Sequence, residues 1–140
     1  MALIGFVKAI LGICETPPLD AGLWTVEGNQ VTIRLGEATA LAPAGGAARL
    51  EGNGLASSVL VVHTGDHYLA FENRCTHGGR RLDPVAGREE LRCCSVHHSR
   101  FDYEGNKVFG PAEGSLKRYA VEKRGGELVV ILNGASLDDS

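Results

Sequence analysis

The stretch CTHGGRRLDPVAGREELRCCSVHHSRFD, residues 75–102, contains three of the chain's four cysteines and three of its five histidines. It opens with a Cys-x-His box formed by Cys75 and His77. A Cys-x-x-His box, Cys94 and His97, follows after sixteen residues. Each box comes directly after an apparent strand, so each should lie on a loop. Two loops that each offer one thiolate and one imidazole can close around a metal centre from opposite sides.

The rest of the chain shows the pattern of many short strands joined by tight turns. Residues 31–35 alternate apolar with polar side chains, and residues 58–63 do so less regularly. Turn residues at 65–66, 105–106 and 125–126 each separate two such segments, and they predict three hairpins. The sequence therefore predicts an all-β fold, either a sandwich or a barrel.

Two segments depart from the strand pattern. Residues 2–14 are apolar on most of a helical circumference, and Pro17 and Pro18 end this segment because two prolines cannot continue a helix. Residues 38–55 are rich in alanine and glycine, and we expect them to form a long, loosely ordered connection. The chain is thus divided into an apolar helix and linker (1–22), a metal-binding β domain (23–134) and a polar tail (135–140).

Length and composition exclude several classes of protein. The 140 residues make one domain of ordinary size, with 44% hydrophobic and 22% charged residues. A net charge of −3 gives no support to a nucleic-acid binder, which usually has a basic face. The longest apolar stretch, residues 2–14, is shorter than the roughly 20 residues of a membrane-spanning helix, and it lacks the features of a signal peptide. We expect a cytoplasmic protein without a transmembrane span, in which cysteines serve as ligands or buried thiols.

The two boxes and the residues around them resemble the Rieske [2Fe–2S] proteins, and among these the soluble Rieske-type ferredoxins. The resemblance covers roughly residues 57–132. It includes Cys75-Thr76-His77-Gly78-Gly79 with Leu82, then Cys94 and His97 with Ser99, Phe101 and Asp102, and finally Gly110-Pro111. The family's fold is an antiparallel β-sandwich with two cluster-binding loops, here preceded by a short N-terminal helix. Residues 23–134 would then form the Rieske domain.

The resemblance implies one [2Fe–2S] cluster per chain, with Cys75, His77, Cys94 and His97 as its metal ligands. The thiolates would bind one iron and the imidazoles the other. The electron added on reduction would reside on the histidine-bound iron, because thiolates stabilise ferric iron. Histidine ligation raises the potential of such centres to about −150 to +300 mV. The resemblance also places Gly78, Gly79, Ser99, Phe101 and Pro111 around the cluster.

Several positions depart from the high-potential members of the family. Arg80 and Val96 stand where those proteins carry two cysteines joined as a disulfide, and Phe101 stands where they have a tyrosine that donates to a cysteine sulfur. Ser99 keeps a hydroxyl at a position where it can donate to a bridging sulfide. The resemblance therefore implies a reduction potential in the low to middle part of the Rieske range.

His98 stands where the family usually has a small residue, and it leaves an alternative ligand pair open. Cys93 with His97, or Cys94 with His98, would also give one thiolate and one imidazole. We favour Cys94 and His97, since only this frame keeps the downstream motif in register. Cys93 is then a buried or neighbouring thiol.

The expected function is one-electron transfer rather than catalysis. As the resemblance implies, a flavoprotein reductase would be the donor, and an oxygenase or another reductase the acceptor. One alternative is an electron-transfer subunit of a larger oxidoreductase, with residues 2–14 as an oligomer or subunit contact. A structural zinc module is another, although zinc motifs usually pair their ligands as C-x₂₋₄-C and H-x₃₋₅-H. A terminal oxygenase would need a further iron site of two histidines and a carboxylate, and no histidine follows residue 110.

Overall fold

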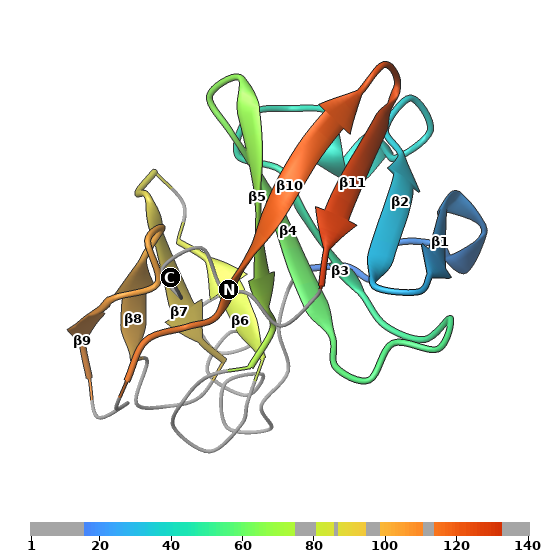
Figure 1. Ribbon diagram of the computed structural model, residues 1–140. Helices are drawn as coiled ribbons and strands as arrows, with labels where there is room; N and C mark the ends of the chain where they lie inside the picture. The colour runs from blue at the N-terminus through green and yellow to red at the C-terminus, as the bar shows by residue number, and fades with distance from the viewer. Residues whose placement is uncertain (1–15, 75–80, 86, 95–98, 111–113, 133–140) are drawn as a thin grey trace. The chain divides into compact units, whose positions relative to one another are not determined.

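The computed structural model describes residues 16–74, 81–85, 87–94, 99–110 and 114–132, and it divides into two compact units. Of the described residues, the large-sheet unit contains 17–72 and 117–132. The small-sheet unit contains Thr16 and the described part of the segment 73–116. In the described residues each unit is built on one antiparallel sheet (Figure 1). The predicted all-β antiparallel fold is confirmed.

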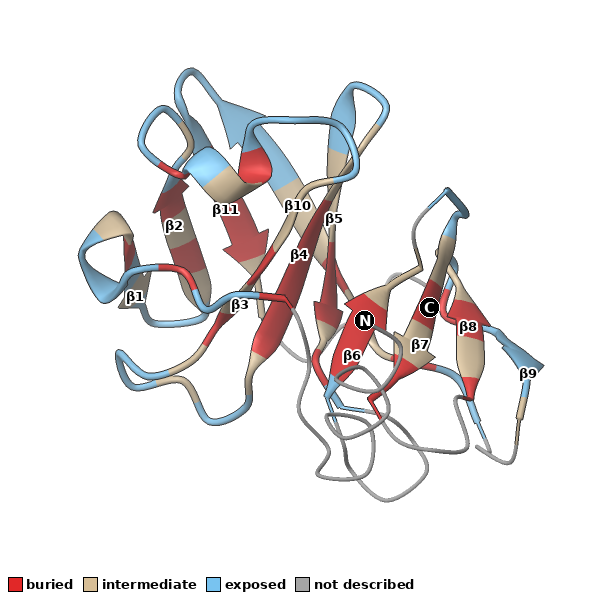
Figure 2. Cartoon of the chain, turned by 180° about the vertical axis from the view of Figure 1, so that it is seen from behind, coloured by how far each residue is buried: buried red, intermediate tan, exposed pale blue. Residues whose placement is uncertain are grey.

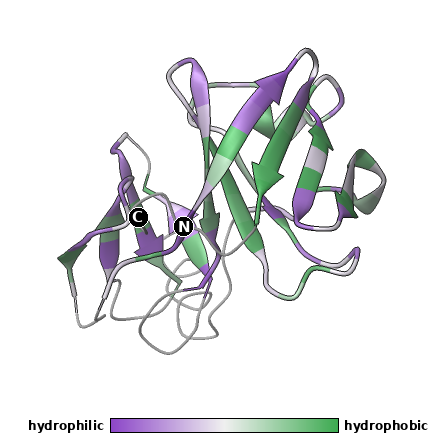
Figure 3. Ribbon diagram, viewed as in Figure 1, coloured by the Kyte–Doolittle hydropathy of each residue, from purple (hydrophilic) through white to green (hydrophobic). Residues whose placement is uncertain are grey.

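The large sheet has seven strands among the described residues, in the order β1-β2-β11-β10-β5-β4-β3. Its strands are β1 (Trp24–Glu27), β2 (Gln30–Arg34), β3 (Ala47–Leu50), β4 (Val59–Thr64), β5 (His67–Glu72), β10 (Arg118–Arg124) and β11 (Glu127–Ile131). Two short 3₁₀ helices, η1 (Ala21–Leu23) and η2 (Thr39–Leu41), belong to the same unit. Figure 3 shows the apolar residues that run along β4 and β11, and the hydrophilic outer half of β10.

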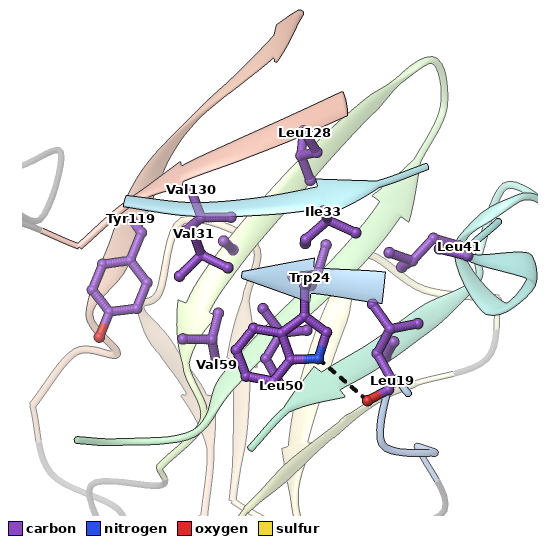
Figure 4. Close-up of a cluster of buried hydrophobic side chains, with 14 residues drawn as sticks. Leu19, Trp24, Val31, Ile33, Leu41, Leu50, Val59, Tyr119, Leu128 and Val130 are labelled. Atoms are coloured by element: carbon purple, nitrogen blue, oxygen red, sulfur yellow. Dashed lines mark hydrogen bonds between the residues drawn. The ribbon is translucent and has the colours of Figure 1, made fainter. Parts of the chain in front are cut away.

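The core of this unit is formed by one side of the sheet, because alternate residues of a strand point to the same face. Every strand of the large sheet contributes at least one buried apolar side chain to a single cluster (Figure 4). The largest of these is Trp24, whose ring nitrogen donates a hydrogen bond to the carbonyl oxygen of Leu19 at 3.3 Å. The period-two pattern of Val31 and Ile33, both fully buried, thus marks a strand with one buried face, as predicted.

The three predicted hairpins are confirmed. Residues 65–66 join β4 to β5, and residues 125–126 join β10 to β11. Residues 103–106 join the strand that ends at Asp102 to the strand that begins at Lys107. Turns with positive φ at their glycines connect these strands, and this conformation is accessible to glycine at little cost.

The expectation of a loosely ordered connection over residues 38–55 is wrong. This stretch contains η2 and β3, and β3 pairs with β4 from Ala47↔Val62 to Leu50↔Val59. Ala48 and Leu50 are both fully buried on the core face. Alanine and glycine have low strand propensity, so their abundance masks the alternation, and packing against β4 decides the conformation instead.

The predicted helix over residues 2–14 and the polar tail 135–140 lie outside the described residues. Within the part of the chain that the structure describes, no helix is long and apolar enough to span a membrane.

The ends of the small-sheet segment emerge from neighbouring strands of the large sheet. β5 ends at Glu72 and β10 begins at Arg118, and these strands pair through Arg118↔Phe71 and Tyr119↔Ala70. The backbone N–H of Glu72 donates to the carbonyl oxygen of Lys117 at 2.9 Å. The chain therefore leaves the large sheet and returns to it at adjacent points.

Replacing Leu50 with alanine tests the role of β3 in the core. Since the Leu50 side chain is fully buried, we expect its truncation to cost about 2–5 kcal/mol of unfolding free energy. The matched variant Leu55→Ala removes a partly buried leucine at the edge of the same cluster and should cost less. Urea denaturation measures both values, and a loss below about 1 kcal/mol for Leu50→Ala would show that β3 is not part of the core.

The ionisation of Tyr119 gives a second prediction, on stability at alkaline pH. Burial, followed by the charge of Glu72, raises the pKa of Tyr119 to about 12. An unfolded tyrosine ionises near pH 10, so the unfolded chain loses this proton first and the unfolding free energy should fall between about pH 10 and pH 12. We expect Tyr119→Phe to fall less steeply over this range in denaturant titrations. If the unfolding free energy of Tyr119→Phe falls as steeply as that of the wild type, other groups cause the loss of stability at alkaline pH.

Candidate metal centre

The two Cys/His boxes adjoin the small sheet. Its strands, in the order β6-β7-β8-β9, are β6 (Leu82–Pro84), β7 (Glu90–Cys93), β8 (Arg100–Asp102) and β9 (Lys107–Phe109). β6 begins just after the first box, and β7 ends just before the second. Since Leu82 pairs with Cys93 across these antiparallel strands, the described residues that follow the first box lie beside the start of the second.

Two hydrogen bonds involve the described residues that flank the first box. The buried side chain of Asn73 accepts from the backbone N–H of Leu82 at 2.8 Å through Oδ1, so a residue before the box is held to a residue after it. The carbonyl oxygen of Arg81 accepts from the backbone N–H of Cys94 at 2.9 Å. The second bond links Cys94, the first residue of the second box, to the chain that follows the first box.

The residues that flank the second box are also joined by a hydrogen bond. The backbone N–H of Cys93 donates to the carbonyl oxygen of Ser99 at 2.7 Å. Ser99 is 1% exposed. The described residues directly before and shortly after the second box therefore lie together.

The two adjacent cysteines differ in their place on the strand. Cys93 alternates with Leu91 on the buried side of β7, opposite Leu82 and Phe101 of the flanking strands. Cys94 lies just beyond the end of β7. Both cysteines are buried. The expectation that Cys93 is a buried residue beside the box is confirmed, and its place in the apolar layer favours Cys94 as the ligand.

A third segment reaches the same place from β9. Gly110 directly follows β9, and its Cα lies so close to Ser99 that a Cβ at position 110 would be 2.5 Å from the Ser99 Cα. Further along, the backbone N–H of Leu116 donates to the carbonyl oxygen of Gly105 at 2.8 Å and closes the segment 106–115. The segment that contains Pro111 thus begins in contact with the end of the second box.

Of the residues predicted from the sequence, the structure describes Cys94, Ser99 and Phe101. Phe101 is fully buried and pairs with Leu91. The other predicted ligands and neighbours lie outside the described residues; these are Cys75, His77, His97, Gly78, Gly79 and Pro111.

Charged residues support the small sheet beside the boxes. Asp83 is 3% exposed, and its Oδ1 accepts hydrogen bonds from both the backbone N–H and the hydroxyl of Thr16. The guanidinium of Arg92 lies 3.6 Å from the other carboxylate oxygen of Asp83. Sequence reasoning missed the contact between Thr16 and Asp83, since no local pattern connects residues that are 67 positions apart.

Further ion pairs lie on the same sheet. The Oε1 atom of Glu90 is 3.6 Å from Nη1 of both Arg88 and Arg100. The Arg100 guanidinium also lies 4.9 Å from the ring centre of Phe109, which is half-exposed on the edge strand β9. Figure 2 shows β9 as exposed along its length, in contrast to the buried positions of β7. Burial, followed by the charge of Glu89, raises the pKa of Tyr103 after β8.

Comparison with protein-family models identifies the family of this chain. The model of the Rieske [2Fe–2S] domain matches residues 25–120. The chain belongs to the Rieske [2Fe–2S] family. Its members hold one [2Fe–2S] cluster in this domain, and the chain accordingly carries one such cluster.

Three comparisons with known proteins show how far the likeness extends. Over 72 residues the chain is 36% identical to carotenoid phi-ring synthase of Chlorobaculum tepidum, a match that covers 51% of this chain and 11% of that protein. The ferredoxin of carbazole 1,9a-dioxygenase from Nocardioides aromaticivorans IC177 has a TM-score of 0.58 and 28% identity, over 71% of this chain and 96% of that one. A chain from the complex of reduced oxygenase and oxidised ferredoxin in carbazole 1,9a-dioxygenase has a TM-score of 0.56 and 25% identity, over 71% and 92%.

The described residues fit a Rieske cluster. Cys94 is buried directly after β7, and its backbone N–H donates to the carbonyl oxygen of Arg81, in the chain that follows the first box. Thiolate and imidazole are the two ligand types of a Rieske centre. Burial limits the access of water to the cluster, which is one of the factors that set its potential.

Removing the side-chain acceptor of Asn73 tests the closure of the first box. Asn73→Leu keeps the branched shape of the side chain but leaves the N–H of Leu82 without this acceptor, and a buried, unsatisfied donor costs about 1–3 kcal/mol. We expect the visible absorbance of the cluster to be lost at a lower urea concentration than in the wild type. Asn73→Asp keeps an acceptor oxygen and should lose less; equal losses in the two variants would contradict the role of this bond.

Proposed function

We propose that this chain is a one-electron carrier whose [2Fe–2S] cluster is bound by Cys75, His77, Cys94 and His97. The observation that carries the proposal is the hydrogen bond between the Arg81 carbonyl and the Cys94 N–H at 2.9 Å. It links the first residue of the second box to the chain that follows the first box, and this supports a cluster shared by the two boxes. The chain is proposed to transfer electrons without transforming a substrate.

The ligands divide the chemistry of the site between two kinds of donor. Cys75 and Cys94 are proposed to bind one iron, and His77 and His97 the other. The bound cluster supplies one reversible electron. The protein supplies a buried cysteine at position 94, proposed to bind as a thiolate, and the buried Ser99 two residues after the second box. Because Phe101 offers no hydroxyl, we keep the proposal of a low to middle reduction potential.

The proposed acceptor is an oxygenase and the proposed donor a flavoprotein reductase. Two likenesses support an oxygenase as the acceptor. One is to the ferredoxin of carbazole 1,9a-dioxygenase, and the other is to a chain from the complex of oxygenase and ferredoxin in carbazole 1,9a-dioxygenase. Electron-transfer complexes of this kind are typically small and transient. We propose that the Rieske domain extends from residue 23 to residue 134 and that residues 2–14 form an oligomer contact. The proposed location of the protein is the cytoplasm.

A second candidate function is that of an electron-transfer part of a larger oxidoreductase. The match to carotenoid phi-ring synthase favours it, because there the similar segment covers 11% of a much longer protein. The two functions differ in the native assembly. A carrier is recovered from its source alone and is reoxidised by an added oxygenase, whereas a subunit co-purifies with the rest of its enzyme.

Spectroscopy on the purified protein tests the proposed cluster. We expect a red-brown oxidised form, and after dithionite a rhombic EPR signal with the low average g of a cluster with mixed cysteine and histidine ligands. Cys94→Ser should abolish this signal because it removes a ligand. The matched variant Cys93→Ala changes the neighbouring buried cysteine and should retain the signal, at some cost in stability.

Two outcomes would contradict the proposal. A colourless protein with stoichiometric zinc and no iron would indicate a structural zinc module. A signal that survives in Cys94→Ser but is lost in Cys93→Ala would move the thiolate ligand to Cys93 and shift the frame of the second box.

A further inference from the structure

One row of side chains crosses all four strands of the small sheet. Its members, one from each strand and paired in register, are Asp83, Arg92, Arg100 and Phe109. The row is next to the pair Leu82↔Cys93, after which the chain enters the second box at Cys94. Register partners place their side chains on the same face of a sheet, so the four residues form one strip of surface close to the start of the second box.

Exposure rises along this row from β6 to β9. The side chains of Asp83, Arg92 and Arg100 are 4%, 26% and 32% exposed. Phe109, at the end of the row, is 54% exposed. The guanidinium of Arg100 lies 4.9 Å from the ring centre of Phe109, so a cation lies over the exposed ring. The row thus ends at an apolar side chain with a positive charge beside it.

The ion pairs of this face turn their cations toward solvent. The side chain of Arg88 is 58% exposed, whereas that of Glu90 is 22% exposed. Glu90 lies within 3.6 Å of both Arg88 and Arg100, so one carboxylate serves two cations. The pair of Arg92 with the buried Asp83 has the same order of exposure. A partner that approaches this face therefore meets arginines before it meets carboxylates.

A further carboxylate of the same face, Asp102, is used by the backbone. It lies opposite Glu90 in the register of β7 and β8. Its Oδ1 atom accepts from the N–H groups of Glu104 and Asn106 at 3.0 and 2.9 Å. These bonds hold the carboxylate in the turn that follows β8, so it does not cancel the charge of the arginines beside Phe109.

The edge strand β9 is protected against strand pairing, but its side chains are open to contact. The strand has three residues, begins with Lys107, and has a register shift against β8. Short strands, bulges and lysines are means by which proteins prevent pairing between sheet edges. Val108 and Phe109 are nevertheless the exposed large apolar residues of the described chain (Figure 2). This combination favours a contact made by side chains over the addition of a strand.

We propose that the face of the small sheet with Arg88, Arg100 and Phe109 is the docking surface for a redox partner that presents carboxylates around an apolar residue. The inference rests on the proposed function, because it requires a cluster that exchanges electrons. Opposite charges increase the rate of association, and an apolar centre with a charged rim is the usual form of a protein contact. A second copy of the chain would bring arginines against arginines, so the charges favour an acidic partner.

Two electron acceptors of opposite charge test this surface. The dithionite-reduced protein is mixed in a stopped-flow instrument with plastocyanin, an acidic copper protein, or with cytochrome c, a basic protein. We expect the second-order rate constant with plastocyanin to fall as salt is added, because salt screens the attraction. The net charge of −3 predicts the opposite, a rate with plastocyanin that rises with salt. A rate that rises or does not change would overturn the proposal.

Substitutions locate the effect on the small sheet. Arg88→Gln and Arg100→Gln should each lower the rate with plastocyanin at low salt by about 1.5- to 5-fold, and should leave the rate with cytochrome c unchanged or raise it. Phe109→Ser should lower the rate with plastocyanin at low and at high salt, since it removes the apolar contact. Arg124→Gln is the matched control, because Arg124 pairs with Glu122 on the large sheet and is 52% exposed. An equal loss in this control would assign the effect to net charge and overturn the proposal.

Measurements on each variant separate docking from other causes. The reduction potentials should equal that of the wild type, and a loss of rate explained by a changed potential would overturn the proposal. Arg88 lies outside the strands, so Arg88→Gln keeps the test available if Arg100→Gln does not fold. Analytical ultracentrifugation that shows a wild-type dimer and a Phe109→Ser monomer would assign the surface to a second copy instead. The proposed function fails separately, if the wild-type protein has no rhombic EPR signal or reduces neither acceptor.

Discussion

The antiparallel pairing of β6 with β7 is the constraint on which the metal centre depends. Leu82 opposite Cys93 sets the register, and the hydrogen bond from Cys94 to Arg81 extends the ladder by one more step. A shift of one residue would exchange the faces of the strand and place Cys93 where Cys94 now stands. Strand register therefore decides which of the two cysteines follows β7 directly. Burial of Leu82, Leu91 and Phe101 in one apolar layer fixes that register.

Hydrogen bonds to the backbone then define the borders of each box. The Asn73 amide, the Ser99 carbonyl and the Gly105 carbonyl each accept from an N–H on the far side of a loop. Such closures reduce the number of conformations open to the intervening residues. Each of these hydrogen bonds lies within the small-sheet unit, and the described residues of the large-sheet unit form a core of their own that includes Trp24.

The parts of the fold that the sequence predicts are those with a local physical signal. The hairpin at residues 65–66 combines a strand period with a turn glycine, and both features lie within a dozen residues. In β3, Ala48 and Leu50 show the alternation of a strand, yet the residues around them in the sequence have the composition of a loop. Pairing with β4 gives this segment its strand conformation.

The same distinction between local and long-range signals applies to the metal centre. The spacing of cysteines and histidines predicts the four ligands, of which Cys94 lies among the described residues. Asn73 has no partner that its sequence neighbourhood reveals, because its acceptor role depends on Leu82 nine residues away. The contact of Gly110 with Ser99 is equally hidden, since it arises only when β9 pairs with β8.

The adjacency of Glu72 and Lys117 has a consequence for how such a chain can be rebuilt. The whole segment between them enters and leaves through two strands that already pair, at a point closed by a 2.9 Å hydrogen bond. Inserted domains are tolerated where their two ends lie close together. The segment 73–116 is thus a cassette: a short turn could replace it and join β5 to β10 as an ordinary hairpin. The large sheet would then serve as a redox-silent scaffold, into which segments with other ligand sets could be spliced.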